Sequence, residues 1–370
     1  MPEVRVIESL AAIEPAEWAA LFPGELEDYH YLLAVERAGL PGFGFRYLVV
    51  HEDGRLLAAA PAFVTRYPLD TTLTGSARRM AGALRRAFPD ALTLRLACIG
   101  SPCTERALVG FAPEVSALGR GQLTGLIFDA FEELARRERC GLLGVKDAAA
   151  DDRAPWATAA ILRGYAPLAS LPIARLEIDF PDIDAYFARL SHATRRDMRR
   201  KLRRRGEVRV EVRADVSDLI EEVMALYRQT LARADMSFEE LTADFFLGVP
   251  REMAGRAFYV LYFVDDRLLG ANLLIQDEGV LLDKFFVMDE AAGRPLNLYF
   301  LSWFTNVELC LERGLARYQA GQAAYRDKLR LGCRLVRTTN HFRHRNLLLN
   351  AALGLAAPLF AADPTLEDAA

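Results

Sequence analysis

The sequence contains few cysteines and histidines. Its 370 residues include five cysteines and five histidines. No Cys-x-x-Cys pair occurs and no histidine stands at zinc-ligand spacing; the cysteines are scattered at positions 98, 103, 140, 310 and 333. We therefore expect no metal site, and scattered cysteines favour a reducing compartment.

Long apolar runs are also missing. No stretch reaches the ~18–20 apolar residues that cross a bilayer. The N-terminus carries acids where a signal peptide has a basic and then an apolar run. These features predict a cytoplasmic protein without a transmembrane segment. The most apolar stretch, Leu347–Phe360, opens a predicted C-terminal helix and tail at 347–370; a helix packed on the protein and one bound to a membrane surface or a partner both stay open.

The charge balance is mildly acidic. A formal net charge of −4 argues against a protein that coats nucleic acid, although local basic patches are compatible with it. Hydrophobic residues make up 52% and charged residues 26%, as in soluble globular proteins. The length allows two domains, each with its own core.

The most regular pattern lies between Arg256 and Lys328. Three apolar runs rich in aromatic and β-branched residues predict strands joined by tight turns. A Gly-Arg-Pro break then precedes a long apolar helix, which Gly314 ends, and a short strand follows. The predicted elements are strands 257–265, 267–276 and 279–288, helix Leu296–Glu312 and strand Ala316–Ala320.

The first half of the chain repeats this order. Leu48–Pro61 and Val260–Leu273 share an apolar strand, an acidic turn, Arg-Leu-Leu and a second strand. Farther on, Gly119–Arg139 and Leu296–Arg313 are both helices followed by a strand. Such self-similarity predicts a duplication. We expect one lobe at 1–170, with an insertion at 67–110, and a second at 171–346, with a boundary near Pro167–Pro172. Pro61 predicts a kink or bulge in its strand.

A strongly basic helix is predicted at Ser191–Arg205, with eight Lys or Arg residues against the single acid Asp197. Ser191 is a plausible N-cap. An apolar stripe recurs every fourth residue, at Leu190, Thr194, Met198 and Leu202. The other faces are cationic. They either pair with nearby acids such as Glu207 and Glu211 or dock phosphate or an acidic partner, which arginine suits because its planar fork bonds two oxygens.

Three strands, a crossover helix and a further strand resemble the central unit of the GNAT acyltransferase fold. Gly321–Gly332, with the sequence GQAAYRDKLRLG, resembles the ending of the FemAB-like branch of that superfamily. The basic helix and the tandem lobes are similar to that branch as well. The resemblance spans roughly Leu171–Arg345 and implies an α/β fold with mixed sheets, in two tandem GNAT-like lobes.

The resemblance implies transfer of an acyl group to an amine. Asp283 and Lys284 interrupt an apolar strand, where a charge is costly unless it is paired or wet; Asp283 is the candidate base, or forms a structural ion pair with a lysine. Tyr325 and Lys328 share a helix face and are the candidate proton donor and phosphate ligand, with a structural role as the alternative. Candidate acceptor-binding residues are Asn272, Gln276 and Lys284.

Donor phosphate is expected at the basic helix, through Arg195, Arg196, Arg199 and Arg200, with Arg294, Asn297 and Lys328. In GNAT proteins the helix after the third strand of this unit presents its N-terminus to a pyrophosphate. The familiar glycine-rich loop is absent from Glu290–Pro295, and Pro295 removes an amide donor there. This departure weakens the case for acetyl-CoA.

Three functions stay open. The first is transfer from a thioester, either acyl-CoA or an acyl-carrier protein, to a small-molecule amine. The second is FemAB-like aminoacyl transfer from aminoacyl-tRNA, in which the helix at 191–205 would contact the tRNA. The third is a non-catalytic lobe pair that binds an acidic partner.

Overall fold

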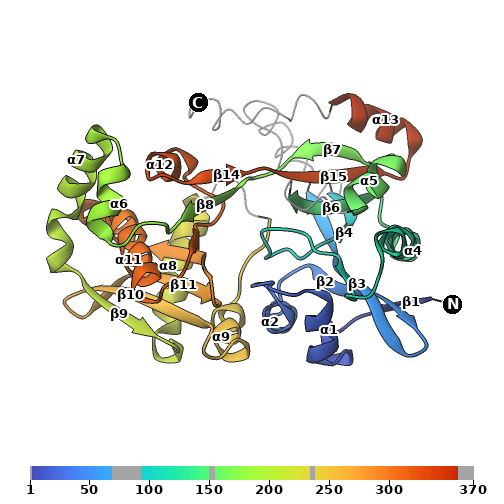
Figure 1. Cartoon of the computed structure of the whole chain (residues 1–370), viewed down its shortest axis with the longest axis horizontal. Helices are drawn as coiled ribbons and strands as arrows, with labels where there is room; N and C mark the ends of the chain where they lie inside the picture. The colour runs from blue at the N-terminus through green and yellow to red at the C-terminus, as the bar shows by residue number, and fades with distance from the viewer. Residues whose placement is uncertain (1, 69–92, 150–154, 234–237, 357–370) are drawn as a thin grey trace, which may run out of the picture. The chain divides into compact units, whose positions relative to one another are not determined.

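The computed structural model describes residues 2–68, 93–149, 155–233 and 238–356 (Figure 1). The chain divides into two compact units. The first contains the chain up to Leu171, residues 238–240 and the segment from Arg337 onward; the second runs from Pro172 to Val336 apart from that short excursion. The division falls between Leu171 and Pro172.

The first unit is built on one mixed sheet. The strand order is β1-β2-β3-β4-β6-β15-β7, with β5 beside β3. The β4–β6 pair is parallel and the other pairs are antiparallel. The strands are β1 (Glu3–Ile7), β2 (Phe43–Glu52), β3 (Arg55–Pro68), β4 (Thr93–Ile99), β5 (Gly110–Phe111), β6 (Leu142–Ala149), β7 (Ala166–Ala169) and β15 (Thr338–His344). The helices are η1 (Leu10–Ala12), α1 (Pro15–Leu21), α2 (Tyr29–Arg37), α4 (Ala117–Arg137), α5 (Pro155–Leu162) and α13 (Leu347–Ala356).

The second unit repeats the plan. Its strand order is β14-β8-β13-β12-β11-β10-β9, and its parallel pair is β12–β13. The strands are β8 (Ile173–Glu177), β9 (Arg209–Arg213), β10 (Ala257–Val264), β11 (Arg267–Gln276), β12 (Val280–Met288), β13 (Arg317–Gln319) and β14 (Arg334–Val336). The helices are α6 (Ile183–Arg189), α7 (His192–Lys201), η3 (Leu202–Glu207), η4 (Ser217–Leu219), α8 (Ile220–Arg233), α9 (Ala243–Glu252), α10 (Glu290–Gly293), η5 (Arg294–Leu296), α11 (Leu298–Glu312) and α12 (Tyr325–Arg330).

Helices cover both faces of the second sheet. Apolar residues of α6, α7 and α11 form one core with alternate residues of β10 and β11, and Phe187 stacks on Phe304 there. On the other face, Tyr227 of α8 and Phe246 of α9 pack edge-on against Phe285 of β12. Burial on both faces explains why β10 and β11 are almost continuously apolar.

The duplication predicted from the sequence is visible in the two hairpins β2–β3 and β10–β11. Their turns place Asp53 and Asp265 at the same position, both with a φ of 50°. The hairpin register shifts between Val50 and His51 in one unit and between Tyr262 and Phe263 in the other. Because the matched turns and matched bulges stand at equal offsets in the aligned segments, the two lobes share a backbone plan as well as a residue pattern.

Three local expectations differ from the structure. Thr338–His344, expected in the second lobe, forms β15 and pairs with β6 and β7 of the first sheet, since strand pairing depends on distant partners. The expected insertion at 67–110 contains β4, a central strand of that sheet, while 69–92 lie outside the described residues. Pro61 pairs with Tyr47 without a register shift; it faces the gap between β5 and β4, where its missing N–H leaves no partner unpaired.

The ends of the chain and the cysteines give two further findings. Helix α13 buries part of Leu353, while Leu347 and Leu348 are more than four-fifths exposed (82% and 81%). None of the helices in the described segments is long and apolar enough to cross a bilayer. All five cysteines are buried, and none forms a disulfide.

Candidate active site

The parallel pair in the second sheet opens partway along its length. Strand β12 pairs with β13 only from Val280 to Leu282. Beyond Leu282, β12 continues to Met288 and is bonded to β11 on one side. On that side the register passes from Leu273/Phe285 to Leu274/Asp283, so Lys284 is the extra residue of a β-bulge. The backbone from Asp283 onward therefore presents an edge that no described strand pairs, next to a bulge that turns its side chains.

The first residue of that open edge carries a hydrogen-bonded carboxylate. Asn272 Nδ2 donates to Asp283 Oδ1 at 2.6 Å, and the Tyr318 hydroxyl donates to Oδ2 at 2.8 Å. Asn306 Nδ2 lies 3.3 Å from the same Oδ2 and 2.8 Å from Asn272 Oδ1. Asn272, Asn306 and Tyr318 are fully buried, whereas Asp283 retains some exposure. The network fixes the carboxylate in one orientation and leaves it accessible at the opening.

The environment makes Asp283 a stronger base than a surface aspartate. Burial raises the pKa of Asp283 above its ordinary 3.8, while the hydrogen bonds from Asn272 and Tyr318 and the charge of Lys328 oppose that rise. Among the described residues Asp283 forms no ion pair, so its partners are amides and a phenol rather than a lysine. A partly exposed carboxylate with a raised pKa is a candidate for proton transfer.

A tyrosine that the sequence analysis did not select lies close to this carboxylate. The Tyr299 hydroxyl, in the first turn of α11, is buried and has no hydrogen-bond partner among the described residues. Burial, followed by the charge of Asp283, raises the pKa of Tyr299, so the phenol stays protonated. A buried hydroxyl without a partner is costly, and a bound substrate would satisfy it. The sequence gives little indication that Tyr299 is a site residue. A single tyrosine at the start of an apolar helix is typical of a residue in the hydrophobic core.

Tyr325 and Lys328 are both buried on α12 and bond to backbone carbonyls. The Tyr325 hydroxyl donates to the Pro172 carbonyl at 2.9 Å. Lys328 Nζ donates to the carbonyls of Ala320 and Gly321, which hold the loop after β13. Lys328 also contributes to the electrostatics of the site, because its charge lowers the pKa of Asp283. These contacts fit the structural alternative for the pair and place Lys328 beside the candidate base.

The three residues predicted to bind the acceptor have different surroundings in the structure. Asn272 belongs to the Asp283 network. Gln276, expected to line the same groove, accepts a hydrogen bond from Arg313 at the end of β11. Lys284 is half-buried at the bulge. The bulge between Asn272 and Gln276 breaks the simple alternation on which the shared groove was predicted.

The N-terminus of α11, where a donor pyrophosphate was considered, is covered by the basic segment. The connection from β12 is coiled into α10 and η5, and the amides of Gly293 and Asn297 bond within it. Asn297 has a left-handed φ of 53°, and its side-chain amide contacts the Lys201 carbonyl at 3.4 Å. The Lys201 ammonium lies 3.4 Å from the centroid of the Phe300 ring. Arg294 is exposed and pairs with Glu290 at 3.1 Å.

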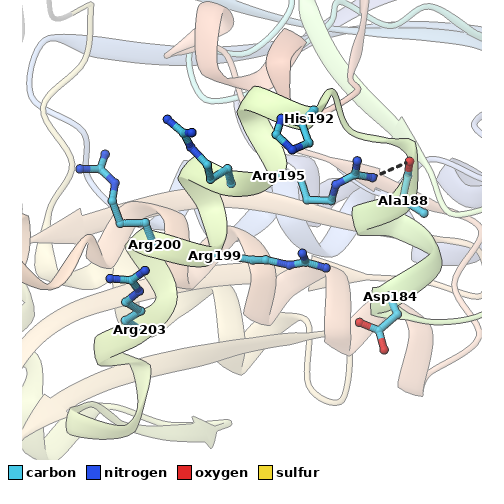
Figure 2. Close-up of a pocket in the computed structure, with 8 residues that line it drawn as sticks. Asp184, Ala188, His192, Arg195, Arg199, Arg200 and Arg203 are labelled. Carbon is cyan, nitrogen blue, oxygen red and sulfur yellow. Dashed lines mark hydrogen bonds between the residues drawn. The ribbon is translucent and has the colours of Figure 1, made fainter.

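The arginines of α7 form a separate surface, so the expected cofactor residues do not converge on one site. Ser191 caps the helix by accepting a hydrogen bond from the Thr194 amide, and Thr194 and Met198 are buried as predicted. The opposite faces line a shallow pocket of about 640 Å³ with α6 (Figure 2). Its lining residues are Asp184, Ala188, His192, Arg195, Arg196, Arg199, Arg200 and Arg203. This pocket contains neither Arg294, Asn297 nor Lys328.

We use the word seam for the line along which the two parallel strands of a sheet meet. In the first unit the seam lies between β4 and β6, and it is closed. Strand β4 ends at Ile99, where its pairing with β6 also ends, and Gly100 turns the chain away with a φ of 118°. Lys146 at the end of the pairing donates to the Thr104 carbonyl at 2.8 Å and forms an ion pair with Asp147. Asp147 also bonds Ser170. Strand β4 has no register shift against β3, so the open edge and the bulge are features of the second unit.

A duplicated lobe with a split parallel strand pair and a crossover helix is the fold of tandem GNAT proteins. Residues 191–329 match the family model described as an acetyltransferase (GNAT) domain. This match lies within the second unit, and solved structures of tandem GNAT proteins share the fold of the whole chain. The comparisons confirm the tandem GNAT-like fold that the sequence predicted, and a GNAT domain in the second unit.

Solved structures share the fold over nearly the whole chain at low identity. FemX matches with a TM-score of 0.59 and 13% identity over 95% of this chain and 100% of that chain. A tandem GNAT protein from the clavulanic acid biosynthesis pathway matches with a TM-score of 0.53 and 13% identity over 94% and 99%. L-PGS from Bacillus licheniformis matches with a TM-score of 0.51 and 12% identity over 93% and 98%. No curated protein matches the sequence.

Proposed function

We propose that the second unit transfers an acyl group from a thioester donor to an amine at the open edge of β12. The observation that carries this proposal is the split of β12 from β13 at Asp283, beside a bulge and a buried amide network. An unpaired strand edge offers backbone N–H and C=O groups to an extended donor chain. In the residues that the structure describes, the first unit has no equivalent open edge, and it takes no part in this reaction.

The chemistry uses the two groups at the opening. Asp283 accepts a proton from the acceptor ammonium, directly or through water, and frees the amine. The amine attacks the acyl carbon, so that a C–N bond forms and the C–S bond breaks. Tyr299 donates its proton to the departing thiolate, and the second ammonium proton returns the phenolate to the phenol. The products are an amide, a thiol and a protonated Asp283, which loses its proton to solvent.

Tyr299 rather than Tyr325 is the proton donor in this proposal. The Tyr299 hydroxyl has no partner among the described residues, whereas Tyr325 already donates to the Pro172 carbonyl. Asn272, Asn306 and Tyr318 position Asp283, and Lys328 positions the loop after β13. The five buried, unlinked cysteines support a further proposal that the protein works in a reducing compartment such as the cytoplasm.

A second donor class is favoured by one observation. The pyrophosphate position of an acyl-CoA donor, at the N-terminus of α11, is coiled and covered by the basic segment. An aminoacyl-tRNA donor, which the FemAB resemblance implies, does not need that position. Its phosphates would lie on the arginines of α7.

The experiment is an amide-formation assay with three donors and a panel of amines. Small acyl thioesters that lack CoA, acyl-CoA thioesters and aminoacyl-tRNA are each supplied to the full chain. Turnover of a thioester that is abolished by Asp283→Asn supports the proposal. Turnover only with aminoacyl-tRNA, sensitive to ribonuclease, supports the second candidate. A wild-type protein inactive with every donor, or an Asp283→Asn variant as active as wild type, contradicts the proposed site.

A further inference from the structure

The arginine surface of α7 is not used by the chemistry at β12. Arg196 and Arg203 are exposed and form no ion pair or hydrogen bond among the described residues. Other basic residues of the segment are engaged: Arg200 pairs with Asp197 at 2.7 Å, and Arg204 pairs with Glu207 at 2.7 Å. Arg195 donates to the Ala188 carbonyl at 3.2 Å. The two unengaged arginines therefore both line the pocket.

The pocket presents this charge as two rows. Arg195 and Arg199 stand four residues apart, as do Arg196 and Arg200, so each row repeats at about 6 Å along the helix. Arg199 lies over the Phe187 ring, 5.7 Å from its centroid, which holds its guanidinium in place. In Figure 2 Arg199 extends toward α6, whereas Arg200 and Arg203 extend to the other side of α7. Like charges this close repel, so the surface is expected to bind anions.

We propose, on the basis of the acyltransfer function above, that this surface docks an acidic helix of a protein that carries the acyl group as a thioester. An acidic helix with carboxylates three and four residues apart has the same ~6 Å repeat as the arginine rows. Such a helix, about 10 Å wide, fits against α7 alone. Carboxylate and guanidinium form paired hydrogen bonds, which fix the orientation of the carrier.

Acids beside the arginines favour this narrow partner over nucleic acid. Asp184 lines the same pocket. Asp182 caps the N-terminus of α6, and Asp179, before the helix, pairs with Arg189. A duplex laid over α7 would bring a second phosphate strand against these acids. The aromatic rings under the surface, Phe180 and Phe187, are buried and offer no open face for stacked bases. A carrier protein delivers its thioester without a pyrophosphate. It therefore does not need a free binding position at the N-terminus of α11.

The test measures how reversing the charge of two arginines changes carrier binding, and how it changes turnover with and without a carrier. Arg196→Glu combined with Arg203→Glu removes two arginines that hold no structural contact. Arg228→Glu on α8 is the matched control, because Arg228 is an exposed helical arginine with no ion pair among the described residues. Binding of a fluorescent acyl-carrier protein is measured by anisotropy at two salt concentrations. Turnover is measured with the acylated carrier and with a small thioester lacking any carrier.

We expect the double variant to bind the carrier at least tenfold more weakly and to show a raised KM for the carrier. Its turnover of the small thioester should not change. The control variant should match the wild type in all three measurements. Binding should also weaken as salt rises. A wild-type chain that ignores the carrier but acylates amines from the small thioester overturns the docking proposal and retains the proposed function. Binding of a duplex RNA, lost in the double variant, overturns it in favour of nucleic acid. Carrier binding without turnover of any thioester retains docking and contradicts the proposed function.

Discussion

At the scale of single residues, the proposed chemistry depends on the carboxylate of Asp283. Asp283→Asn keeps the shape and part of the hydrogen bonding of the side chain but cannot accept a proton. We expect kcat to fall by about 100-fold or more, the usual contribution of a general base. Circular dichroism and thermal unfolding should show a folded protein. An active variant would remove Asp283 from the mechanism.

The raised pKa of Asp283 gives a pH dependence with a defined sign. Because burial raises its pKa in the folded protein, the folded state holds the proton at pH values where the unfolded state has lost it. Stability should therefore fall as pH rises from the ordinary carboxyl pKa of 3.8 toward the folded value, while activity should rise over the same window. Both changes should be absent in Asp283→Asn. Denaturant titrations and pH–rate profiles of the two proteins measure this directly.

The two tyrosines should behave in opposite ways. Tyr299→Phe removes a buried hydroxyl without a partner, so stability should hold or rise slightly while kcat falls. Tyr325→Phe leaves the buried Pro172 carbonyl without its donor and should cost about 1–2 kcal/mol of unfolding free energy, with a smaller change in kcat. The reverse pattern would return the proton-donor role to Tyr325.

At the scale of elements, the paired hairpins provide a test of the duplication. Asp53 and Asp265 both adopt a left-handed φ of 50°, which aspartate tolerates and a β-branched residue does not. Asp53→Val and Asp265→Val should each lower the unfolding free energy by about 1–2 kcal/mol. Asp266→Val, next in the same turn but without a positive φ, is the control and should have little effect. Unequal costs in the two hairpins would show that their turns are not equivalent.

The elements near the site could be predicted to different degrees. Asp283 was found because a charge interrupts an apolar strand, and Asn272 because it lies at a polar position of the neighbouring strand. Asn306 and Tyr318 were missed, although a lone asparagine in an apolar helix is a recognisable signal. The bonds of Tyr325 and Lys328 to backbone carbonyls could not be predicted, because they depend on how the loop after β13 closes. The pairing of β15 with the first sheet likewise depends on strands nearly 200 residues away, which no local pattern records.

At the scale of the whole molecule, duplication has left two seams with different contents. In the second unit β12 runs past its parallel partner and carries the bulge. In the first, β4 ends at Ile99 while β6 continues to Ala149, where the Ala107 amide bonds the Asp147 carbonyl and Lys146 pairs with Asp147. Asp147 holds a positive φ of 56° and bonds Ser170 and Lys146, which explains why it is an aspartate within a strand. In our proposal the first strand pair stabilises the fold, and the second gives the substrates access to Asp283.

This division predicts that damage to the first seam affects folding and not chemistry. Asp147→Ala leaves the largely buried ammonium of Lys146 without its carboxylate and should cost about 3 kcal/mol of unfolding free energy. The protein that remains folded should keep its kcat and KM within about threefold, measured per folded molecule below the unfolding temperature. Asp147→Ala combined with Lys146→Met removes both charges and should recover much of the stability, since a buried pair replaced by apolar groups costs little. A stable Asp147→Ala protein without activity would instead locate the reaction in the first unit, and the open edge of β12 would need another explanation.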